Sequence, residues 1–449
     1  MGALACMLKE IGLEVTGSDH KVYPPMSTFL AEKGIPVADG FKASNIPPDV
    51  DLVVIGNAVR KDNPEALAAA DRRLSYCSMP QALNHFAARG KKIVLITGTH
   101  GKTTTAALAA WVLHHAGLDP SFMIGGILQN FGSNYRVGNG DHIVIEGDEY
   151  DTAFFDKGPK FMHYRPHVAT LTSVEFDHAD IFRDLDHVKQ AFCTFIAGIP
   201  NDGVLVAHHG DANIDDVITG AGCRIDRYGD DPRSCWRPAD ASFNARGTSF
   251  NLLKENRQVG NFESPLLGAH NLSNTVAVIA MAHHLGLSFE TIQSALPKFK
   301  GVKRRQEVRG TKRGITVLDD FAHHPTAVRE TLVAVRPAAE KGRLIAVFEP
   351  RTNSSMRDIF QEDYARAFDA ADMICVRQPP LLEKIPPDHR FSSRRLVKDL
   401  TKRGGNAFYF PDTDAIIDFL VTEARSGDVV FIMSNGGFDN IHDRLLKGL

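Results

Sequence analysis

Residues 91–105 read KKIVLITGTHGKTTT, and this stretch decides the fold that we expect. Its first part, 91–97, is an apolar run rich in β-branched residues, which predicts a buried parallel strand. An Ala-rich segment follows and predicts a helix that ends at Gly117. A Gly-Lys-Thr string between a strand and a helix indicates a phosphate-binding loop, because the backbone N–H groups at a helix start attract anions. We therefore expect an α/β domain that binds a nucleotide.

The loop is shorter than the usual GxxxxGK[ST] pattern, because Ile96 occupies the first glycine position and the spacing is GxxGKT. Lys102 can supply a cation to the β- and γ-phosphates, and the Thr103 hydroxyl can bind Mg²⁺. The alternative is an ordinary glycine turn with a solvated lysine, which the flanking strand and helix disfavour. The predicted nucleotide-binding residues of the loop are Gly98, Thr99, His100, Gly101, Lys102, Thr103 and Thr104.

A chain of 449 residues is longer than one hydrophobic core usually serves, so we expect several domains. Short β-rich runs alternate with helical stretches before the loop, although the chain opens with a helix, MGALACMLKEIG. After residue 302 the pattern restarts with GITVLDD, RLIAVFEP, DMICVRQ, NAFYF and DVVFIMSNGG. The predicted class is α/β with three domains: a Rossmann-like domain at 1–90, a doubly wound domain of the P-loop ATPase type at 91–302, and a Rossmann-like domain at 303–449.

The composition excludes several classes of partner. The 51 basic and 54 acidic residues nearly cancel, so there is no electrostatic reason to expect a nucleic acid or an anionic membrane. The six cysteines form no CxxC pair, which argues against a disulfide framework and a structural zinc site. No apolar run approaches the roughly 18 to 20 residues that span a bilayer. We expect a cytoplasmic protein.

Acidic groups at strand ends are candidate metal ligands, since ligands in open α/β sheets bind beyond the carboxyl ends of strands. Glu146 ends the run DHIVIE and can bind Mg²⁺; the alternative is a solvated strand-end acid. Asp148, Glu149 and Asp151 follow, and four neighbouring acids would repel each other without a cation nearby. His178, in SVEFDHADIF after another strand, is either a second metal ligand or substrate-orienting group, or a structural histidine.

Polar residues later in the chain are candidates for the rest of a nucleotide site. Asn271 and Asn274 lie in GAHNLSN at the start of a predicted long helix, where capping is favoured over base or ribose recognition. Arg305 and Asp320 flank the start of the third domain, a usual place for groups that close over a nucleotide. The alternative for these two residues is a surface charge and a strand-end turn.

Six segments occur in one order along the chain and together resemble the Mur ligase family: GTHGKTTT, EGDEYD, FDH at 176–178, GAHNLSN, GVKRRQE and LDDFAHHPT. The resemblance implies an N-terminal UDP-sugar domain, a central ATPase domain, and a C-terminal domain that brings an amine substrate. It also implies ATP and Mg²⁺ as cofactors. In the implied reaction a carboxylate attacks the γ-phosphate of ATP, and an amine captures the resulting acyl phosphate.

Within the family, EYDTAFFDK, KFMHYRP, EFDHADIF and FEPRTN resemble the branch that joins UDP-N-acetylmuramate to L-Ala-γ-D-Glu-meso-diaminopimelate in murein recycling. The nearest alternative is the L-alanine-adding branch, in which a serine commonly stands at the position of Tyr150. A folate polyglutamate ligase and a P-loop ATPase without ligase activity are more distant alternatives. The implied partners are these two substrates, and we expect a monomer or a weak homodimer.

The resemblance assigns roles to single residues. The implied catalytic residues are Lys102, His178 and Arg305, and the implied metal ligands are Thr103, Glu146 and His178. Asn271 would contact adenine, Asp320 the ribose and Arg305 the γ-phosphate. The implied tripeptide-binding residues are Arg351, Ser434 and Asn435, in a loop that runs from Ser434 to Gly437.

Two features depart from the family pattern. The N-terminal strand and its GxxGxxM loop are missing, except that Met1-Gly2-Ala3 matches the end of that loop, so we expect that the natural product begins upstream. Ser173 replaces an asparagine that commonly precedes the EFDH segment.

Overall fold

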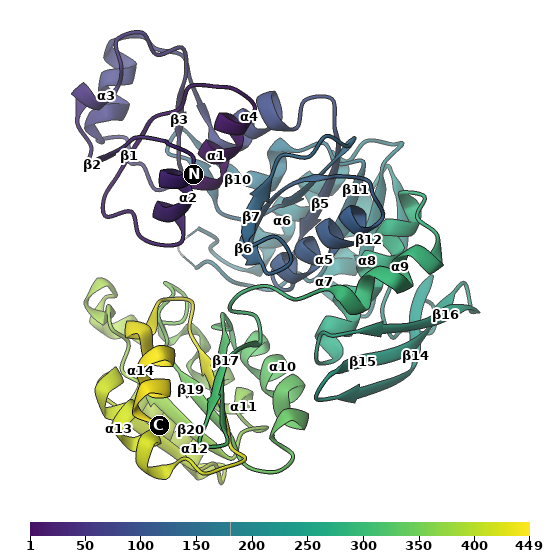
Figure 1. The fold of residues 1–449 in the computed structure, drawn as a ribbon, viewed down its shortest axis with the longest axis vertical. Coiled ribbons are helices and arrows are strands. Elements are labelled where there is room, and N and C mark those ends of the chain that lie inside the picture. Colours follow the sequence, from purple (N-terminus) through teal and green to yellow (C-terminus); the bar gives the residue numbers. More distant parts are fainter. Residues whose placement is uncertain (180) are drawn as a thin grey trace. The chain divides into compact units, whose positions relative to one another are not determined.

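The computed structural model describes residues 1–179 and 181–449 and confirms an α/β fold built mainly from parallel strands (Figure 1). The chain forms two compact units. Unit 1 consists of Met1–Glu175, Leu185–Arg237 and Ala277–Ala295, and unit 2 of Phe176–Asp184, Pro238–Val276 and Leu296–Leu449. Among the described residues, no helix is long and apolar enough to cross a membrane.

The N-terminal part of unit 1 contains two small parallel sheets, which fits the expected Rossmann-like pattern. They pair β1 (Gly17–Asp19) with β2 (Val37–Asp39) and β3 (Val53–Ile55) with β4 (Tyr76–Ser78). The helices are α1 (Gly2–Glu10), α2 (Met26–Glu32), α3 (Pro64–Asp71) and α4 (Met79–Ala82). Helix α3 begins at Pro64 because the Asn63 side chain accepts hydrogen bonds from the N–H groups of Glu65 and Ala66. The helix expected at the chain start is α1.

The central sheet of unit 1 positions the phosphate loop. Its strands pair in the order β14-β13-β12-β11-β5-β8-β6-β7, all parallel except β6 with β7. Their bounds are β5 (Lys92–Thr97), β6 (Ser121–Leu128), β7 (Ser133–Arg136), β8 (His142–Glu146), β11 (Val168–Leu171), β12 (Val204–His208), β13 (Arg224–Tyr228) and β14 (Trp236–Asn244). Strand β5 lies between β8 and β11, so the carboxyl ends of these three strands meet at one edge.

Helices and a small hairpin complete unit 1. Helix α5 (Lys102–His115) starts directly after the loop and packs against β5, β6 and β8 (Figure 1). The other elements are β9 (Asp151–Ala153), β10 (Asp156–Pro159), α6 (Leu185–Ala197), α7 (Ala212–Val217) and α9 (Phe289–Ala295). Helix α8 (Ala269–His284) begins in unit 2 and ends in unit 1.

Unit 2 is built around a second sheet with the order β17-β18-β22-β19-β20-β21, parallel except for β17 with β18. The strands are β17 (Glu307–Lys312), β18 (Ile315–Asp320), β19 (Leu344–Phe348), β20 (Met373–Arg377), β21 (Ala407–Phe410) and β22 (Val429–Met433). The helices are α10 (Pro325–Val335), α11 (Gln361–Ala367), α12 (Ser393–Lys402), α13 (Thr413–Glu423) and α14 (Ile441–Gly448). An antiparallel hairpin of β15 (Gly247–Lys254) and β16 (Arg257–Ser264) also belongs to this unit.

Both faces of the second sheet are buried, which explains why its strands read as continuous apolar runs. Along β19, Leu344, Ala346 and Phe348 enter one apolar cluster, while Ile345 and Val347 enter another. The carboxyl ends of β18, β22, β19 and β20 meet at one edge, because these strands are parallel neighbours. Polar residues that follow them therefore lie close together.

Candidate active site

The backbone of the phosphate loop requires glycine at two positions. Gly98 has φ +125°, and a Cβ there would lie 2.2 Å from Thr172 Oγ1 and 2.9 Å from the Ser173 nitrogen. Gly101, with φ +80°, precedes α5 in a left-handed conformation. Glycine takes these conformations without the steric cost that a Cβ brings. The loop can therefore pass close to the end of β11, with the start of α5 directly behind it.

Hydrogen bonds join the loop to the segment after β11. The Thr172 hydroxyl donates to the His100 carbonyl over 2.5 Å, and Ser173 Oγ accepts from the His100 N–H over 2.9 Å. The Glu175 N–H donates to Thr99 Oγ1 over 2.9 Å. Ser173, which departs from the family pattern, therefore has a part in holding the loop.

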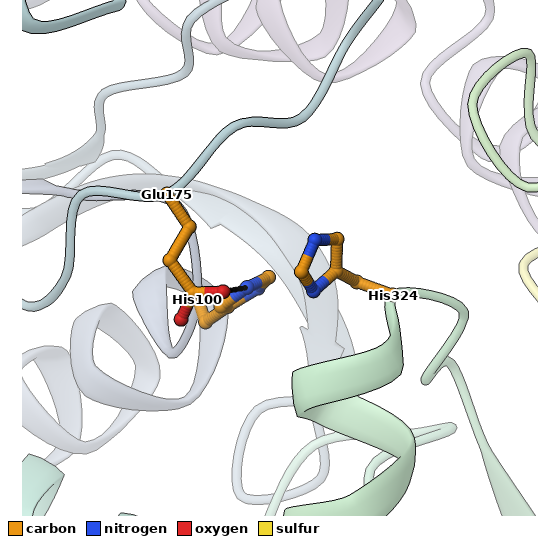
Figure 2. Close-up of side chains that lie close together, drawn as sticks. All are labelled: His100, Glu175 and His324. Atoms are coloured by element: carbon orange, nitrogen blue, oxygen red, sulfur yellow. Dashed lines mark ion pairs between the residues drawn. The ribbon is translucent and has the colours of Figure 1, made fainter. Parts of the chain in front are cut away.

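The His100 side chain lies beside a carboxylate at this junction. Figure 2 shows its ring beside Glu175, with 3.6 Å between His100 Nε2 and Glu175 Oε2. The third residue drawn there, His324, belongs to unit 2, where its ring accepts a hydrogen bond from the Thr326 N–H and caps α10. His324 thus has a capping role within its own unit.

Lys102 is held over the loop by a buried acid. Its Nζ donates to the carbonyls of Gly98 and Thr99 over 2.5 and 3.0 Å, and it lies 2.7 Å from Glu149 Oε2. The Lys102 side chain is 11% exposed and that of Glu149 is 3% exposed. A buried ammonium needs a nearby carboxylate to compensate its lost hydration. Glu149 therefore sets the position of the lysine that sequence analysis assigned to the phosphates.

Glu146 and Thr103 form a pair of hard oxygen ligands. Glu146 Oε1 accepts from the Thr103 hydroxyl over 2.8 Å, and Oε2 accepts from the Gly125 N–H over 2.7 Å. A Cβ at residue 125 would lie 3.0 Å from Glu146 Oε2, so a glycine there allows the close approach. Mg²⁺ prefers a few carboxylate and hydroxyl oxygens together with phosphate and water. These two side chains fit that preference.

For three of the four neighbouring acids, lysines of the protein supply the nearby cation that the sequence led us to expect. Each of the three has its own lysine at 2.7 to 3.0 Å: Asp148 with Lys160, Glu149 with Lys102, and Asp151 with Lys157. Glu146 differs, because its two hydrogen-bond donors are neutral and no ion pair involves it within residues 1–179 and 181–449. Its charge remains available to a metal ion.

In unit 2, three residues of the predicted nucleotide set lie together. Asp320 is 2% exposed and accepts from the N–H groups of Gln306 and Ala322 over 2.8 and 2.7 Å. Burial raises the pKa of Asp320, against the opposing charge of Arg305. Asn271 Nδ2 donates to Gln306 Oε1 over 3.4 Å. The Arg305 guanidinium lies 5.0 Å from the centre of the Phe321 ring.

Capping does not explain the two asparagines of GAHNLSN. Both lie inside α8, which begins at Ala269, and both are buried. Asn271 Nδ2 donates to the Leu267 carbonyl over 2.9 Å, and Asn274 Nδ2 donates to Asn271 Oδ1 over 3.2 Å. A capping side chain lies before the helix and accepts from its N–H groups. The favoured capping interpretation is therefore wrong.

His178 lies in a turn of unit 2, with a left-handed φ of 54°. Its N–H donates to Asp177 Oδ1 over 2.7 Å, and its carbonyl accepts from the Ile181 N–H over 2.8 Å. Asp177 Oδ2 also lies 3.8 Å from His323 Nε2. Burial alone would raise the pKa of Asp177, but the bond and charge of His323 and the charges of His178 and His324 hold it well below its usual value. The metal role of His178 stays a prediction.

The predicted peptide-binding residues lie at the carboxyl edge of the second sheet. Ser434 Oγ donates to Glu349 Oε1 over 2.7 Å and accepts from the Gly436 N–H over 2.9 Å, so this hydroxyl has partners within the protein. The Arg351 side chain packs on Gly436, where a Cβ would lie 2.2 Å from Arg351 Cδ. The buried Oδ1 of Asn435 has no hydrogen-bond partner among the described residues.

Sequence reasoning missed the contacts of several residues whose partners lie far along the chain. A polar residue beside an assigned motif was the available signal for each of them: Glu149 in EGDEYD, Ser173 before EFDH, Gln306 in GVKRRQE, and Glu349 at the end of RLIAVFE.

Comparisons with known proteins agree with the resemblance. Three family models match successive parts of the chain: "Mur ligase family, catalytic domain" at residues 1–91, "Mur ligase middle domain" at 96–282, and "Mur ligase, glutamate ligase domain" at 304–436. The boundaries 1–90, 91–302 and 303–449 stay a proposal.

Relatives match over the whole chain. The UDP-N-acetylmuramate–L-alanyl-γ-D-glutamyl-meso-2,6-diaminoheptandioate ligase of Escherichia coli is 39% identical over 450 residues, covering 100% of this chain and 96% of its own. A UDP-N-acetylmuramate–L-alanine ligase of Acetivibrio thermocellus is 32% identical, covering 100% and 93%.

Solved structures match as well. The murein peptide ligase of Psychrobacter arcticus has a TM-score of 0.74 at 34% identity, covering 100% of this chain and 96% of its own. The UDP-N-acetylmuramate-alanine ligase of Thermotoga maritima has a TM-score of 0.82 at 24% identity, which shows a shared fold alone. With three successive domain matches and relatives above 30% identity along its full length, this chain belongs to the Mur ligase family.

Proposed function

We propose that this ligase joins UDP-N-acetylmuramate to the tripeptide L-Ala-γ-D-Glu-meso-diaminopimelate through an acyl phosphate formed from ATP. The relative from E. coli and the murein peptide ligase structure support this substrate assignment by their names. The observation that carries the chemistry is the 2.8 Å contact between the Thr103 hydroxyl and the Glu146 carboxylate beside the phosphate loop. We place the reaction in the cytoplasm, with a monomer or a weak homodimer as the working form.

In the proposed reaction a carboxylate oxygen of the muramoyl group attacks the γ-phosphorus, and ADP leaves. The peptide amine then attacks the acyl carbon, loses a proton, and displaces inorganic phosphate. The main obstacle is electrostatic, because a carboxylate must approach a polyphosphate. The N–H groups at the start of α5 and the Lys102 ammonium would attract the phosphate oxygens.

Lys102 must exchange partners when a nucleotide binds. Its ammonium already contacts two loop carbonyls and Glu149. A phosphate oxygen would replace at least one of these contacts, and Glu149 would keep the ammonium near the loop. Mg²⁺ bound by Thr103 and Glu146 would withdraw charge from the transferred phosphoryl group.

The other nucleotide contacts are proposals from the family resemblance. We assign Asn271 to adenine, Asp320 to the ribose, Arg305 to the γ-phosphate and His178 to a second metal ion. The contacts among Asn271, Gln306 and Asp320 support a preformed arrangement, because side chains already held by hydrogen bonds lose little freedom on binding.

For the amine substrate, we assign Arg351 to a peptide carboxylate and Ser434 and Asn435 to the rest of the tripeptide. An arginine can hold a carboxylate with two parallel hydrogen bonds. The alternative is L-alanine as the amine. Tyr150 favours the tripeptide, because the L-alanine-adding branch commonly has serine at this position. The centre of the Tyr150 ring lies 5.5 Å from Lys160 Nζ.

The test supplies UDP-N-acetylmuramate and Mg·ATP with either L-alanine or the tripeptide, and measures phosphate release and the mass of the UDP-linked product. We expect a product with the tripeptide and a much lower kcat/KM with alanine. Turnover with alanine alone would overturn the substrate assignment. Phosphate release that needs neither amine nor UDP-sugar would favour a P-loop ATPase.

A further inference from the structure

Arg377 joins three groups at the carboxyl edge of the second sheet. It is the last residue of β20 and is buried. Its Nη1 forms an ion pair with Oε2 of the fully buried Glu349, and its Nη2 lies 2.7 Å from Asp439 Oδ2. The guanidinium also lies 5.4 Å from the centre of the Phe438 ring. One side chain thus connects the ends of two strands to a turn after a third.

That turn has a strained backbone. Phe438, Asp439 and Asn440 are consecutive and have left-handed φ values of 45°, 48° and 57°. Asparagine and aspartate tolerate this conformation, but a bulky residue such as phenylalanine rarely adopts it. Such a conformation persists only when its surroundings hold it. The surroundings here are Arg377 and the Thr413 hydroxyl, which donates to Asp439 Oδ2 over 2.7 Å.

The other branch from Arg377 reaches the start of the Ser434–Gly437 loop. Glu349 uses Oε2 for Arg377 and Oε1 for the Ser434 hydroxyl. Arg304 donates to the carbonyls of Ser434 and Gly436 over 2.5 and 2.7 Å. The loop is therefore held at its first residue through Glu349 and just beyond its last residue through Asp439. Arg377 contacts both Glu349 and Asp439, while Arg304 holds the carbonyls of Ser434 and Gly436 separately.

Inside this loop, the Asn435 side chain carries a buried acceptor without a partner among the described residues. Within the described chain, Asn435 Oδ1 is buried and accepts no hydrogen bond. A buried acceptor without a donor is unfavourable, so native structures rarely keep one without a reason. An N–H group would satisfy this acceptor, and the proposed amine substrate carries several.

We propose that Arg377 is a positioning residue for the amine substrate: it holds the loop so that Asn435 Oδ1 accepts a hydrogen bond from an N–H of the peptide. Arg377 itself does not touch the substrate. This inference rests on the proposed function. It names the protein group that would bind the amine substrate. The phosphate loop, in unit 1, is not part of this network.

The first test is Arg377→Lys, which keeps the charge but cannot bridge Glu349 and Asp439 together. We expect the KM for the tripeptide to rise about tenfold, as for one lost hydrogen bond, while the KM for ATP stays within about twofold. Equal changes in both KM values, or no change in either, would overturn the proposal.

Arg343→Lys is the matched control. Arg343 also pairs with a buried acid, Asp428, over 2.7 Å, but it precedes β19 at the opposite edge of the same sheet. We expect this control to lower the melting temperature and to leave both KM values unchanged. If Arg343→Lys raised the tripeptide KM as much as Arg377→Lys does, the effect would not be specific to Arg377. That result would overturn the positioning role of Arg377.

A second variant tests the acceptor directly. Asn435→Ala should raise the tripeptide KM by a similar factor, and the double variant with Arg377→Lys should be little worse than either single variant, because both act through one contact. If the increase in tripeptide KM in the double variant equalled the product of the two single increases, Arg377 and Asn435 would act independently, and the proposal would be contradicted.

Hydrogen exchange separates this inference from the proposed function. In Arg377→Lys the amides of Gly436 and Asn440, which donate to Ser434 Oγ and the Gly437 carbonyl, should exchange faster while β22 stays protected. This holds whether or not the tripeptide is the substrate. Unchanged exchange in a folded variant would overturn the role of Arg377, and a wild-type enzyme that ignores the tripeptide would overturn only the substrate assignment.

Discussion

Glu146 and Glu349 occupy equivalent places in two sheets, and their partners make them different. Glu146 ends β8, and Glu349 directly follows β19; both strands lie inside mainly parallel sheets. Glu146 is held by a hydroxyl and a backbone N–H, which leave its charge uncompensated. Glu349 is fully buried and paired with Arg377, so its charge is already balanced. A strand-end position therefore does not by itself distinguish a candidate metal ligand from a structural acid, and the charge of the partners makes Glu146 the better candidate.

The comparison predicts that Glu146→Gln has the largest effect. The amide would keep hydrogen-bonding capacity but lose the charge that we propose binds Mg²⁺, so we expect kcat to fall about 10³-fold. The melting temperature without nucleotide should change little. Phosphate release and thermal unfolding measure the two quantities; a variant that keeps wild-type kcat would show that Glu146 is an ordinary strand-end acid.

Glu349→Gln should do the opposite: it should lower the stability of the protein strongly and change the kinetics with ATP little. Removing this acid leaves the buried Arg377 with the half-exposed Asp439 as its remaining ion-pair partner, which costs about 3 kcal/mol of unfolding free energy, the low end for a broken buried pair. The KM for ATP should stay unchanged, because the Glu349 side chain contacts Arg377 and Ser434 and none of the residues that we assign to the nucleotide. Urea unfolding and steady-state kinetics test this. If the variant were as stable as wild type, Glu349 would not be a structural acid.

Glu149→Gln should affect both the stability of the unliganded protein and its response to ATP. Lys102 would lose a buried partner, so we expect the unliganded protein to lose about 3 kcal/mol of stability. ATP would supply a replacement anion, so the rise in melting temperature on adding Mg·ATP should exceed that of wild type. A smaller rise than in wild type would mean that Glu149 does not compete with phosphate for Lys102.

The smallest effect concerns acid stability at the amino edge of the second sheet. Burial alone would raise the pKa of Asp428, but hydrogen bonds from Arg343 and from the Arg425 N–H outweigh it and hold the pKa below its usual value. A carboxyl with a depressed folded-state pKa adds stability above its unfolded pKa, and this contribution is lost as the pH falls through the folded-state pKa.

Asp428→Asn should remove this acid-dependent contribution, so its unfolding free energy should fall less steeply than that of wild type below about pH 4. The KM values at neutral pH should not change. Unfolding curves across the acid range measure the slope. A variant with the same slope as wild type would show that Asp428 does not titrate in the folded protein as described.

Sequence reasoning succeeded for features whose residues are neighbours along the chain. The phosphate loop and its strand and helix lie within 91–117, and strands buried on both faces, such as β5 and β22, read as apolar runs. Strands β14, β15 and β16 were missed, because their mixed burial produces no apolar run. The fold class was predictable because parallel sheets leave the strongest pattern.

The site was predictable only in part, because partners distant in sequence leave no local pattern. Arg377 and Ser434 meet Glu349 from 28 and 85 residues away, through strand order alone. The lysines that neutralise the acids after Glu146 come from the helix α5, the β9–β10 hairpin and a short 3-10 helix that starts at Lys160. The capping interpretation of Asn271 failed because α8 begins at Ala269.

The central claim is that Thr103 and Glu146 hold the magnesium ion of the bound nucleotide. A crystal structure with Mg²⁺ and a non-hydrolysable ATP analogue tests it most directly. We predict Mg²⁺ at about 2.1 Å from Thr103 Oγ1 and from a Glu146 oxygen, directly or through one bound water for the carboxylate. A magnesium ion bound elsewhere, with the Thr103–Glu146 hydrogen bond intact, would contradict the account.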